Sequence, residues 1–219
     1  MRKLSVAASR NYDILIENGL LFQLGSRVKA LGKIQTVALV SETGVYPLFG
    51  AKAEASLKEA GLTVKSFVFP AGESSKCADT YLKLLRFLAE NHLTRTDAIV
   101  ALGGGVVGDL AGFAAATYLR GIRFIQVPTT LLAAVDSSVG GKTAIDLPEG
   151  KNLVGSFWQP SLVLCDTGCL DTLPRNIFRD GCAEVIKYGI LFDREFFDYL
   201  AETGMGFDRE YVIERCVAM

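Results

Sequence analysis

The sequence predicts an α/β fold in which a mostly parallel sheet is covered by helices and is followed by the beginning of an all-helical part. Short apolar runs rich in β-branched residues alternate with helical patterns as far as Asp166. Within those runs consecutive positions are apolar, which is typical of parallel strands that are buried on both faces. No further strand pattern follows Leu173. Together these observations favour a layered sheet-and-helix domain.

The individual elements follow in order along the chain. Strands are expected at residues 12–18, 36–41, 62–69, 98–102, 122–128 and 161–166. Helices are expected at residues 20–31, 46–60 and 78–91, and another should start in the glycine-rich stretch after residue 102. Two more helices are expected at residues 175–190 and 208–219. The change of character near Leu173 predicts an α/β domain over residues 1–173 and the incomplete beginning of a helical domain over residues 174–219.

Composition limits the classes of function. The 219 residues are 50% hydrophobic and 21% charged, with a formal net charge of −1. No basic stretch stands out, so nucleic acid is not expected as a partner. The first residues contain no long apolar segment typical of a signal peptide. Five cysteines without paired spacing indicate reduced thiols, and we therefore expect a cytoplasmic protein.

Three consecutive glycines, Gly103 to Gly105, stand directly behind an apolar run. A membrane span over residues 98–119 is one explanation, but it would place Asp109 near the bilayer centre. We favour a strand, a glycine turn and a helix whose N-terminus can bind an anion such as a pyrophosphate. Gly108 would give room on the first helical turn. Asp109 would either complement the helix dipole there or accept hydrogen bonds from cofactor hydroxyls.

Two further polar stretches lie where an α/β core does not need them. "PAGESSK" offers Glu73 and Lys76 after a strand, although it could also be a helix start capped by Ser74 or Ser75. "PTTLLAAVDSSVGGKTAID" ends with Lys142 in a glycine-bounded loop, and Lys151 and Asn152 follow closely. A lysine in such a loop suits a phosphate or carboxylate, and the alternative is an exposed lysine on a flexible turn.

The segment "GCAEVIKYGIL" places Glu184 and Lys187 on one face of a helix. A surface ion pair is the simplest explanation. The neighbouring residues are apolar, however, so the helix is expected to be mostly buried, and a buried carboxylate needs a partner or a metal. The only histidine, His92, follows a helix and is expected to be structural.

Four blocks, "GGGVVGDLAGFAAATYLRGI", "VPTTLLAAVDSSVGGKTAID", "KNLVGSFWQP" and "GCAEVIKYGIL", occur in this order, and together they closely resemble the 3-dehydroquinate synthase family. The resemblance runs from about Tyr12 to the last residue. It implies a Rossmann-like NAD-binding domain and a lyase of the shikimate pathway that needs NAD and a divalent metal, zinc or cobalt. The reaction converts a phosphorylated sugar acid, 3-deoxy-D-arabino-heptulosonate 7-phosphate, to 3-dehydroquinate and phosphate. It proceeds through oxidation, phosphate elimination, reduction and aldol cyclisation, in an enzyme that is expected to be a homodimer.

The resemblance also implies roles for individual residues. Glu184 matches a zinc ligand, and Arg120 matches an arginine that reaches the phosphate site of the neighbouring subunit. The residues that match substrate contacts are Asp136, Lys142, Asn152 and Lys187. Those that match the NAD site are Ala71, Gly72, Glu73, Ser74, Ser75, Lys76, Gly105, Val106, Val107, Gly108, Asp109, Thr129, Thr130, Lys142, Lys151, Cys169, Leu170, Asp171 and Thr172.

The family pattern continues past Met219, where two histidine zinc ligands would follow. We therefore expect this chain to be an N-terminal portion that is inactive by itself, because a zinc site needs about three protein ligands. Two alternatives stay open: a related cyclase acting on a substrate such as sedoheptulose 7-phosphate, and an inactive NAD-binding module. Metal-dependent alcohol and glycerol dehydrogenases rank lower, since they would lack the run from "DSSVGGKT" to "KN".

Overall fold

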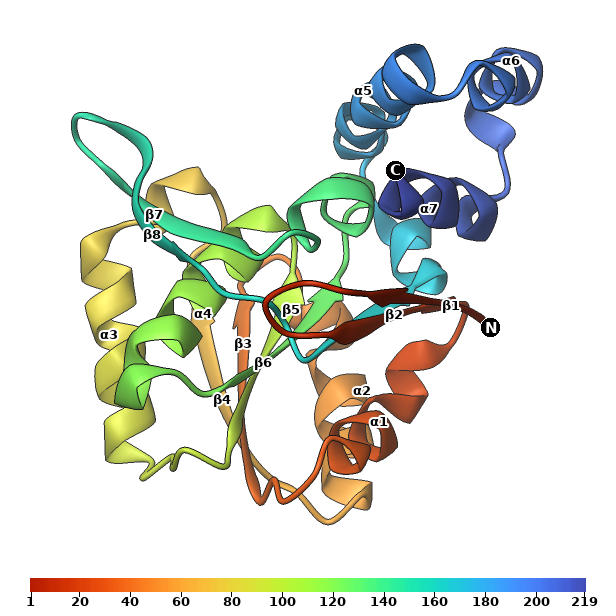
Figure 1. Cartoon of the computed structure of the whole chain (residues 1–219). Helices are drawn as coiled ribbons and strands as arrows, with labels where there is room; N and C mark the ends of the chain where they lie inside the picture. The colour runs from red at the N-terminus through yellow and green to blue at the C-terminus, as the bar shows by residue number, and fades with distance from the viewer.

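The computed structural model describes all residues from 1 to 219 and is built around one seven-stranded sheet (Figure 1). The strand order is β1-β2-β9-β6-β5-β3-β4, and only β1 runs antiparallel to its neighbour. The bounds are β1 (Arg2–Val6), β2 (Tyr12–Glu17), β3 (Thr36–Glu42), β4 (Thr63–Phe69), β5 (Ala98–Gly103), β6 (Arg123–Pro128) and β9 (Leu162–Asp166). The predicted α/β fold is thus confirmed, with all six expected strands present.

Helices cover both faces of this sheet because its strands are apolar on both sides. On one face, Val37 and Leu39 pack with α1 (Leu24–Ala30) and α2 (Tyr46–Glu59). On the opposite face, Ala38 and Val40 of the same strand pack in the core formed with α3 (Ala78–Glu90) and α4 (Gly105–Thr117). Successive side chains of a strand point to opposite faces, so one buried strand supplies both cores.

The helices α5 (Arg175–Phe192), α6 (Arg194–Thr203) and α7 (Arg209–Ala218) follow the last strand and lie beside the β1–β2 end of the sheet (Figure 1). They form a third core, in which Val185, Phe196 and Val212 pack with Ile14 and Val163. The predicted change from alternating strands and helices to helices alone is therefore confirmed. A domain boundary near Leu173 stays a prediction, since the helices beyond it share this core with β2 and β9.

Two features of the fold were not expected from the sequence. The N-terminal strand β1 was not predicted. A separate two-stranded hairpin, β7 (Lys142–Leu147) and β8 (Gly150–Phe157), also occupies a stretch for which no strand was predicted. In Figure 1 this hairpin extends beyond the sheet, next to α3 and α4.

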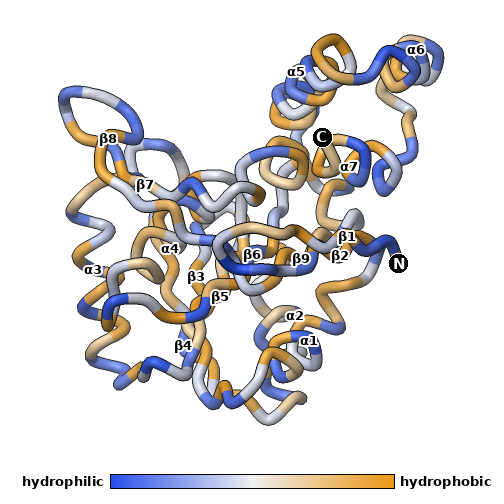
Figure 2. The backbone as a smooth tube through the Cα atoms, in the orientation of Figure 1, coloured by the Kyte–Doolittle hydropathy of each residue, from blue (hydrophilic) through white to orange (hydrophobic).

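The expectation that the first C-terminal helix is mostly buried is wrong. Ile186, Ile190, Leu191 and Phe192 of α5 are 44% to 65% exposed. Figure 2 shows hydrophobic positions both along the interior strands and on α5. The sequence pattern is apolar around much of the helix, but only one side of it faces the core with β2 and β9. None of the helices is both long enough and apolar enough to serve as a membrane span.

Helix α2 and strand β4 are joined by a carboxylate. Glu54 accepts hydrogen bonds from Lys58 Nζ (2.5 Å), from Ser66 Oγ on β4 (2.5 Å) and from the Tyr46 hydroxyl. These bonds, with Lys58 contributing most and Ser66 next, lower the pKa of Glu54 from 4.5 to about 2. Because the charged form is favoured in the folded state, the stabilisation exists above pH 4.5 and is lost as the pH falls towards 2.

We expect Glu54→Gln to lower the free energy of unfolding by about 1–2 kcal/mol at pH 7, because it removes the charge that these three donors stabilise. The difference from wild type should disappear as the pH approaches 2, which urea denaturation at several pH values would measure. Glu59→Gln is the matched control, since Glu59 is exposed on the same helix and forms no ion pair. A difference that stayed constant across the pH range would contradict this prediction.

Candidate functional site

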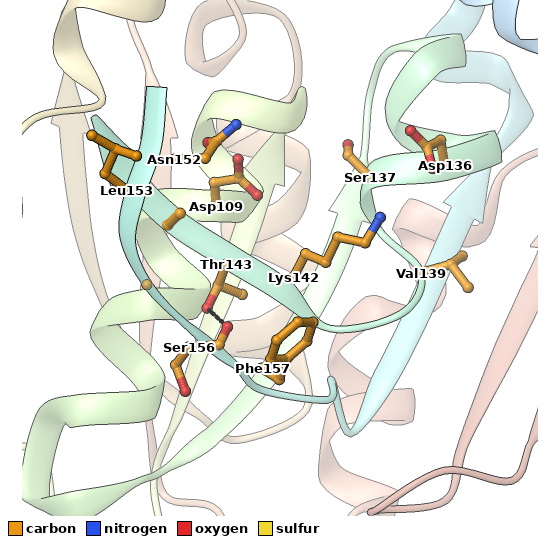
Figure 3. Close-up of a pocket in the computed structure, with 12 residues that line it drawn as sticks. Asp109, Asp136, Ser137, Val139, Lys142, Thr143, Asn152, Leu153, Ser156 and Phe157 are labelled. Atoms are coloured by element: carbon orange, nitrogen blue, oxygen red, sulfur yellow. Dashed lines mark hydrogen bonds between the residues drawn. The ribbon is translucent and has the colours of Figure 1, made fainter. Parts of the chain in front are cut away.

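Two cavities lie beside the segments that follow the parallel strands at their carboxyl ends, which is where open α/β sheets bind ligands. The first, of about 540 Å³, is called here the glycine-turn cavity. Its lining residues are Glu42, Gly44, Val45, Leu48, Phe49, Gly72, Gly104, Gly105, Val106, Val107, Thr129, Thr130, Leu132, Thr172, Leu173, Pro174, Ile177 and Asp180. The second, of about 460 Å³, is called here the hairpin cavity and is lined in part by β7 and β8 (Figure 3).

The glycine turn between β5 and α4 opens into the first cavity. The helix begins at Gly105 after Gly104, and no side chain caps it. The first N–H groups of a helix have no acceptor within the helix, so here they remain available to an anion. A Cβ atom on Gly104 would lie 3.1 Å from Thr130 Cγ2, and one on Gly105 would lie 3.2 Å from Ser137 Oγ. The close approach of the segment after β6 therefore favours glycine at both positions.

Two more polar groups of the glycine-turn cavity point to a ligand with hydroxyl or phosphate groups. The Thr129 side chain is 2% exposed, and its hydroxyl has no hydrogen-bond partner within the protein. A buried hydroxyl without a partner is costly, so a ligand atom is a natural acceptor or donor for it. Glu42 stands at the end of β3 and also lines the cavity. Glu42 is not among the residues predicted from the sequence, although an acidic residue directly after the apolar run "TVALVS" is a usable signal.

The hairpin cavity contains side chains of both signs. Lys142 from β7, Asp136 and Ser137 from the π-helical turn Ala133–Ser137, Asp109 from α4 and Asn152 from β8 line it (Figure 3). Lys142 does not sit in a glycine-bounded loop as expected, because it is the first residue of β7 and follows Gly140 and Gly141, whose φ angles are 85° and 69°. Its side chain is exposed, as the alternative of a lysine on a turn had it. A side chain on a strand is held more rigidly than one on a turn, which suits the recognition of an anion.

A buried lysine lies behind this cavity. The side chain of Lys76 is 5% exposed, and its Nζ donates to Asn152 Oδ1 (2.6 Å) and Asp109 Oδ2 (2.9 Å). Asp146 Oδ1 and Glu73 Oε1 are 3.7 and 3.6 Å away. Burial disfavours the charge on Lys76, but the hydrogen bond to Asp109 and the surrounding carboxylates outweigh it and raise the pKa of Lys76. Burial raises the pKa of Asp109 as well, against the opposing effect of Lys76.

Several local expectations are corrected by this geometry. A Cβ atom on Gly108 would lie 2.6 Å from Gln126 Oε1 on β6, so this glycine gives room to a side chain of the neighbouring strand. Asp109 is not in the first turn of α4 and pairs with Lys76. Neither Ser74 nor Ser75 caps a helix. Residues Glu73–Ser75 form a short 3₁₀ turn, and α3 begins after Cys77.

The structure places only part of the predicted NAD set on the glycine-turn cavity: Gly72, Gly105, Val106, Val107, Thr129, Thr130 and Thr172 line it. Asp109 and Lys142 line the hairpin cavity together with Asp136 and Asn152. The other predicted residues line neither cavity: Ala71, Glu73, Ser74, Ser75, Lys76, Gly108, Lys151, Cys169, Leu170, Asp171, Arg120, Glu184 and Lys187. The side chains of Cys169 and Leu170 are buried in the two cores next to β9, so only their backbones could face a ligand.

The predicted metal ligand lies on α5. Glu184 forms an ion pair with Lys187, so the simple explanation of these two residues as an ion pair is confirmed. The hydroxyl of the neighbouring Tyr188 has its pKa raised to about 12, first by burial and then by Asp136 and Glu184. Nowhere in the chain do three His, Cys, Asp or Glu side chains gather in a group that could hold a metal ion. Arg120 is exposed, in the left-handed turn that ends α4, at the opposite end of that helix from the glycine turn.

Comparisons with known proteins agree with this architecture. Residues 66–180, more than half of the chain, match the family described as 3-dehydroquinate synthase N-terminal. The 3-dehydroquinate synthase of Symbiobacterium thermophilum is 53% identical over 190 residues, which are 86% of this chain and 53% of that protein. The enzyme of Pelobacter propionicus is 54% identical over 201 residues, which are 91% and 56% of the two chains. This chain thus spans about half the length of the curated relatives that it matches.

Solved structures show the same fold. A 2-deoxy-scyllo-inosose synthase in complex with carbaglucose-6-phosphate, NAD⁺ and Co²⁺ matches with a TM-score of 0.90 at 27% identity, over 99% of this chain and 60% of that one. A 2-epi-5-epi-valiolone synthase from Streptomyces hygroscopicus with bound NAD⁺ and Zn²⁺ gives a TM-score of 0.85 at 28% identity, over 98% and 61%. A butanol dehydrogenase from Thermotoga maritima shares the fold at 14% identity, with a TM-score of 0.76 over 99% and 63%.

The glycine turn, the segment that carries Lys142 and the hairpin with Asn152 all fall within the range that the family model matches. The relatives of about 50% identity extend the match over most of the remaining residues. This chain belongs to the 3-dehydroquinate synthase family.

Proposed function

We propose that this chain carries the NAD-binding part of a 3-dehydroquinate synthase. The reaction would convert 3-deoxy-D-arabino-heptulosonate 7-phosphate to 3-dehydroquinate and phosphate. The observation that carries the proposal is the uncapped N-terminus of α4, which opens into a 540 Å³ cavity next to the unpartnered Thr129 hydroxyl. The high identity to proteins with this activity favours it over a related cyclase, because the solved cyclases are only 27% and 28% identical.

The glycine-turn cavity fits a dinucleotide. The free N–H groups at Gly105 and Val106 would hold the pyrophosphate, and Thr129 would gain the hydrogen bond that it lacks. Glu42, at the end of β3, is suited to accept hydrogen bonds from ribose hydroxyls, as an acidic residue does in other dinucleotide-binding sheets. When bound, NAD⁺ supplies a reversible hydride acceptor. It is restored within each turnover of the proposed reaction.

The hairpin cavity would take the phosphorylated sugar acid. Lys142 supplies a positive charge, and Asn152 can donate a hydrogen bond, so both suit anionic groups of the substrate. Asp136 can accept hydrogen bonds from sugar hydroxyls. Lys187, on the nearby α5, would contribute a second cation after release from Glu184. These groups position the substrate against the cofactor, which is their main contribution to rate.

Arg120 supports a homodimer. It is exposed in the turn after α4, at the end of that helix opposite the glycine turn, and it lines neither cavity of its own chain. In the proposed dimer it would extend into the phosphate subsite of the neighbouring subunit. Its backbone lies in the left-handed region with φ 66°, directly after Leu119 with φ 51°, so this turn is strained for non-glycine residues.

The residues of this chain do not by themselves form a metal site. Glu184 is the one residue whose role as a zinc ligand the family pattern supports, and no further ligands gather around it. A catalytic zinc site takes about three protein ligands and an open position. We therefore place only one ligand, Glu184, in this chain.

The 219-residue chain should bind NAD⁺, but only weakly, and Thr129→Val should weaken the binding about tenfold. The substitution keeps the shape of the side chain and removes the hydroxyl that the cofactor would satisfy. Isothermal titration would measure the affinity, and thermal unfolding would measure the stability. The melting temperature should not fall, because the hydroxyl has no partner within the protein.

Ser5→Ala provides the control for this experiment, since the Ser5 hydroxyl bonds to exposed Asp13 on the β1–β2 ribbon, away from both cavities. It should leave the NAD⁺ affinity unchanged. A folded wild-type chain that gives no NAD⁺ signal would contradict the proposed function. An unchanged affinity in Thr129→Val would remove Thr129 from the site.

The chain purified alone should neither retain one zinc ion per chain nor release phosphate from the heptulosonate phosphate. The reason is that a single carboxylate cannot hold zinc against dialysis. Elemental analysis and a phosphate-release assay with added Zn²⁺ and NAD⁺ would test this. Tight zinc at one ion per chain, or turnover with the substrate, would show that no further ligands are needed.

A further inference from the structure

We propose that Lys76 is a positioning residue that fixes the orientation of the Asn152 carboxamide and holds the β7–β8 hairpin against α4. The anion-binding donors of the hairpin cavity would then be assembled before a ligand arrives. That the anion is a phosphate group rests on the proposed function. The contacts that carry the proposal belong to the protein alone.

The ammonium group of Lys76 joins four separate parts of the chain. It donates to Asn152 Oδ1 on β8 at 2.6 Å and to Asp109 Oδ2 on α4 at 2.9 Å. It also lies 3.7 Å from Asp146 on β7 and 3.6 Å from Glu73 in the 3₁₀ turn. Two of the three ammonium hydrogens are donated in the hydrogen bonds to Asn152 and Asp109, and the contacts with Asp146 and Glu73 are longer ion pairs. Lys76 thus makes its contacts within the protein and does not line either cavity.

The contact with Lys76 determines which end of the Asn152 carboxamide is free. The oxygen of the amide accepts the hydrogen bond, so its NH₂ group is left for another partner. A flipped amide would place two N–H donors against an ammonium group that cannot accept them. Asn152 and Asp109 both line the hairpin cavity (Figure 3), so a free amide donor is available at its wall. A donor fixed in this way suits a phosphate oxygen.

The backbone of the hairpin is held at the same point. Asn152 has a φ angle of 58°, in the left-handed region that asparagine tolerates better than most residues. Its N–H donates to Asp146 Oδ1 at 2.8 Å, and the Asp146 N–H donates to the carbonyl of Lys76 at 2.8 Å. Lys76 therefore holds the hairpin through its backbone as well as its side chain.

The charge of Lys76 also makes the cavity acceptable to an anion. Asp109 and Asp146 would repel a phosphate if they stood alone. The ammonium group lies directly against Asp109 and close to Asp146, so it compensates much of this negative charge from behind the cavity wall. Lys142 then adds a positive charge on the ligand side.

The first test compares wild type with Lys76→Met, using inorganic phosphate as the probe. In wild type, phosphate titration should shift the side-chain amide signal of Asn152 in nitrogen-15 NMR spectra. In Lys76→Met the phosphate affinity should fall about tenfold. Backbone amides of residues 147–155 should exchange with deuterium about tenfold faster, and Lys76→Arg should restore much of both losses. Lys83→Met is the matched control, because Lys83 is exposed on α3 and forms no ion pair, so neither readout should change.

Asn152→Asp separates the two roles and remains informative if Lys76→Met does not fold. It keeps an acceptor for Lys76 but replaces the amide donor with a carboxylate. The hairpin should stay protected from exchange while phosphate binding is lost.

Three results would overturn the proposal: unchanged phosphate affinity in Lys76→Met, retained phosphate affinity in Asn152→Asp, or a wild-type Asn152 amide signal that phosphate does not move. A chain that does not bind NAD⁺ would contradict the proposed function. The phosphate affinity, the Asn152 amide signal and the hydrogen exchange of the hairpin would still test the role of Lys76.

Discussion

Helix α4 is packed so closely between the central sheet and the hairpin that Gly112 has no room for a side chain. A Cβ atom on Gly112 would lie 2.4 Å from Thr143 Cγ2 on β7 and 2.9 Å from Phe124 Cε1 on β6. The helix therefore lies between the central sheet and the hairpin, and both rest on its backbone. A two-stranded hairpin is marginally stable by itself, so β7 and β8 depend on this surface. The position of α4 in turn fixes the glycine turn at its N-terminus and Asp109 one turn later, from which both cavities are built.

The central sheet could be predicted from sequence because its strands are apolar without interruption. Runs such as "TVALVS" and "AIVAL" are most simply explained as buried strands in a chain where strand and helix patterns alternate. The hairpin could not be predicted in the same way. Its second strand, Gly150–Phe157, is almost entirely exposed and contains Lys151 and Asn152, so it lacks the alternation of a half-buried strand. It is a strand because β7 and α4 support it, and that support is invisible in a local pattern.

The part of the candidate site that could be predicted consists of backbone groups in the glycine turn and of side chains at the ends of strands. The glycine turn and the threonines after β6 stand where strand ends were expected, and the structure places them on one cavity. The convergence of Lys76, Asp109, Asp146 and Asn152 could not be foreseen, because it joins residues up to 76 positions apart. The exposure of α5 was misjudged for a related reason. An apolar pattern shows which residues prefer burial, but it does not show whether a partner is present.

Strand β2 joins the sheet only through β9, with Asp13 opposite Leu162 and Glu17 opposite Asp166. During synthesis, β1 and β2 precede the other strands of the sheet, yet their place in it does not exist until residue 166 has followed them. Until then β6 is an open edge of a four-stranded sheet formed by β6, β5, β3 and β4. Pairing between such distant segments is slow because a long loop must close first. Strands β1 and β2 therefore join the sheet only after β9 has been made, and the apolar edge of β6 stays unpaired while residues 129–166 are synthesised.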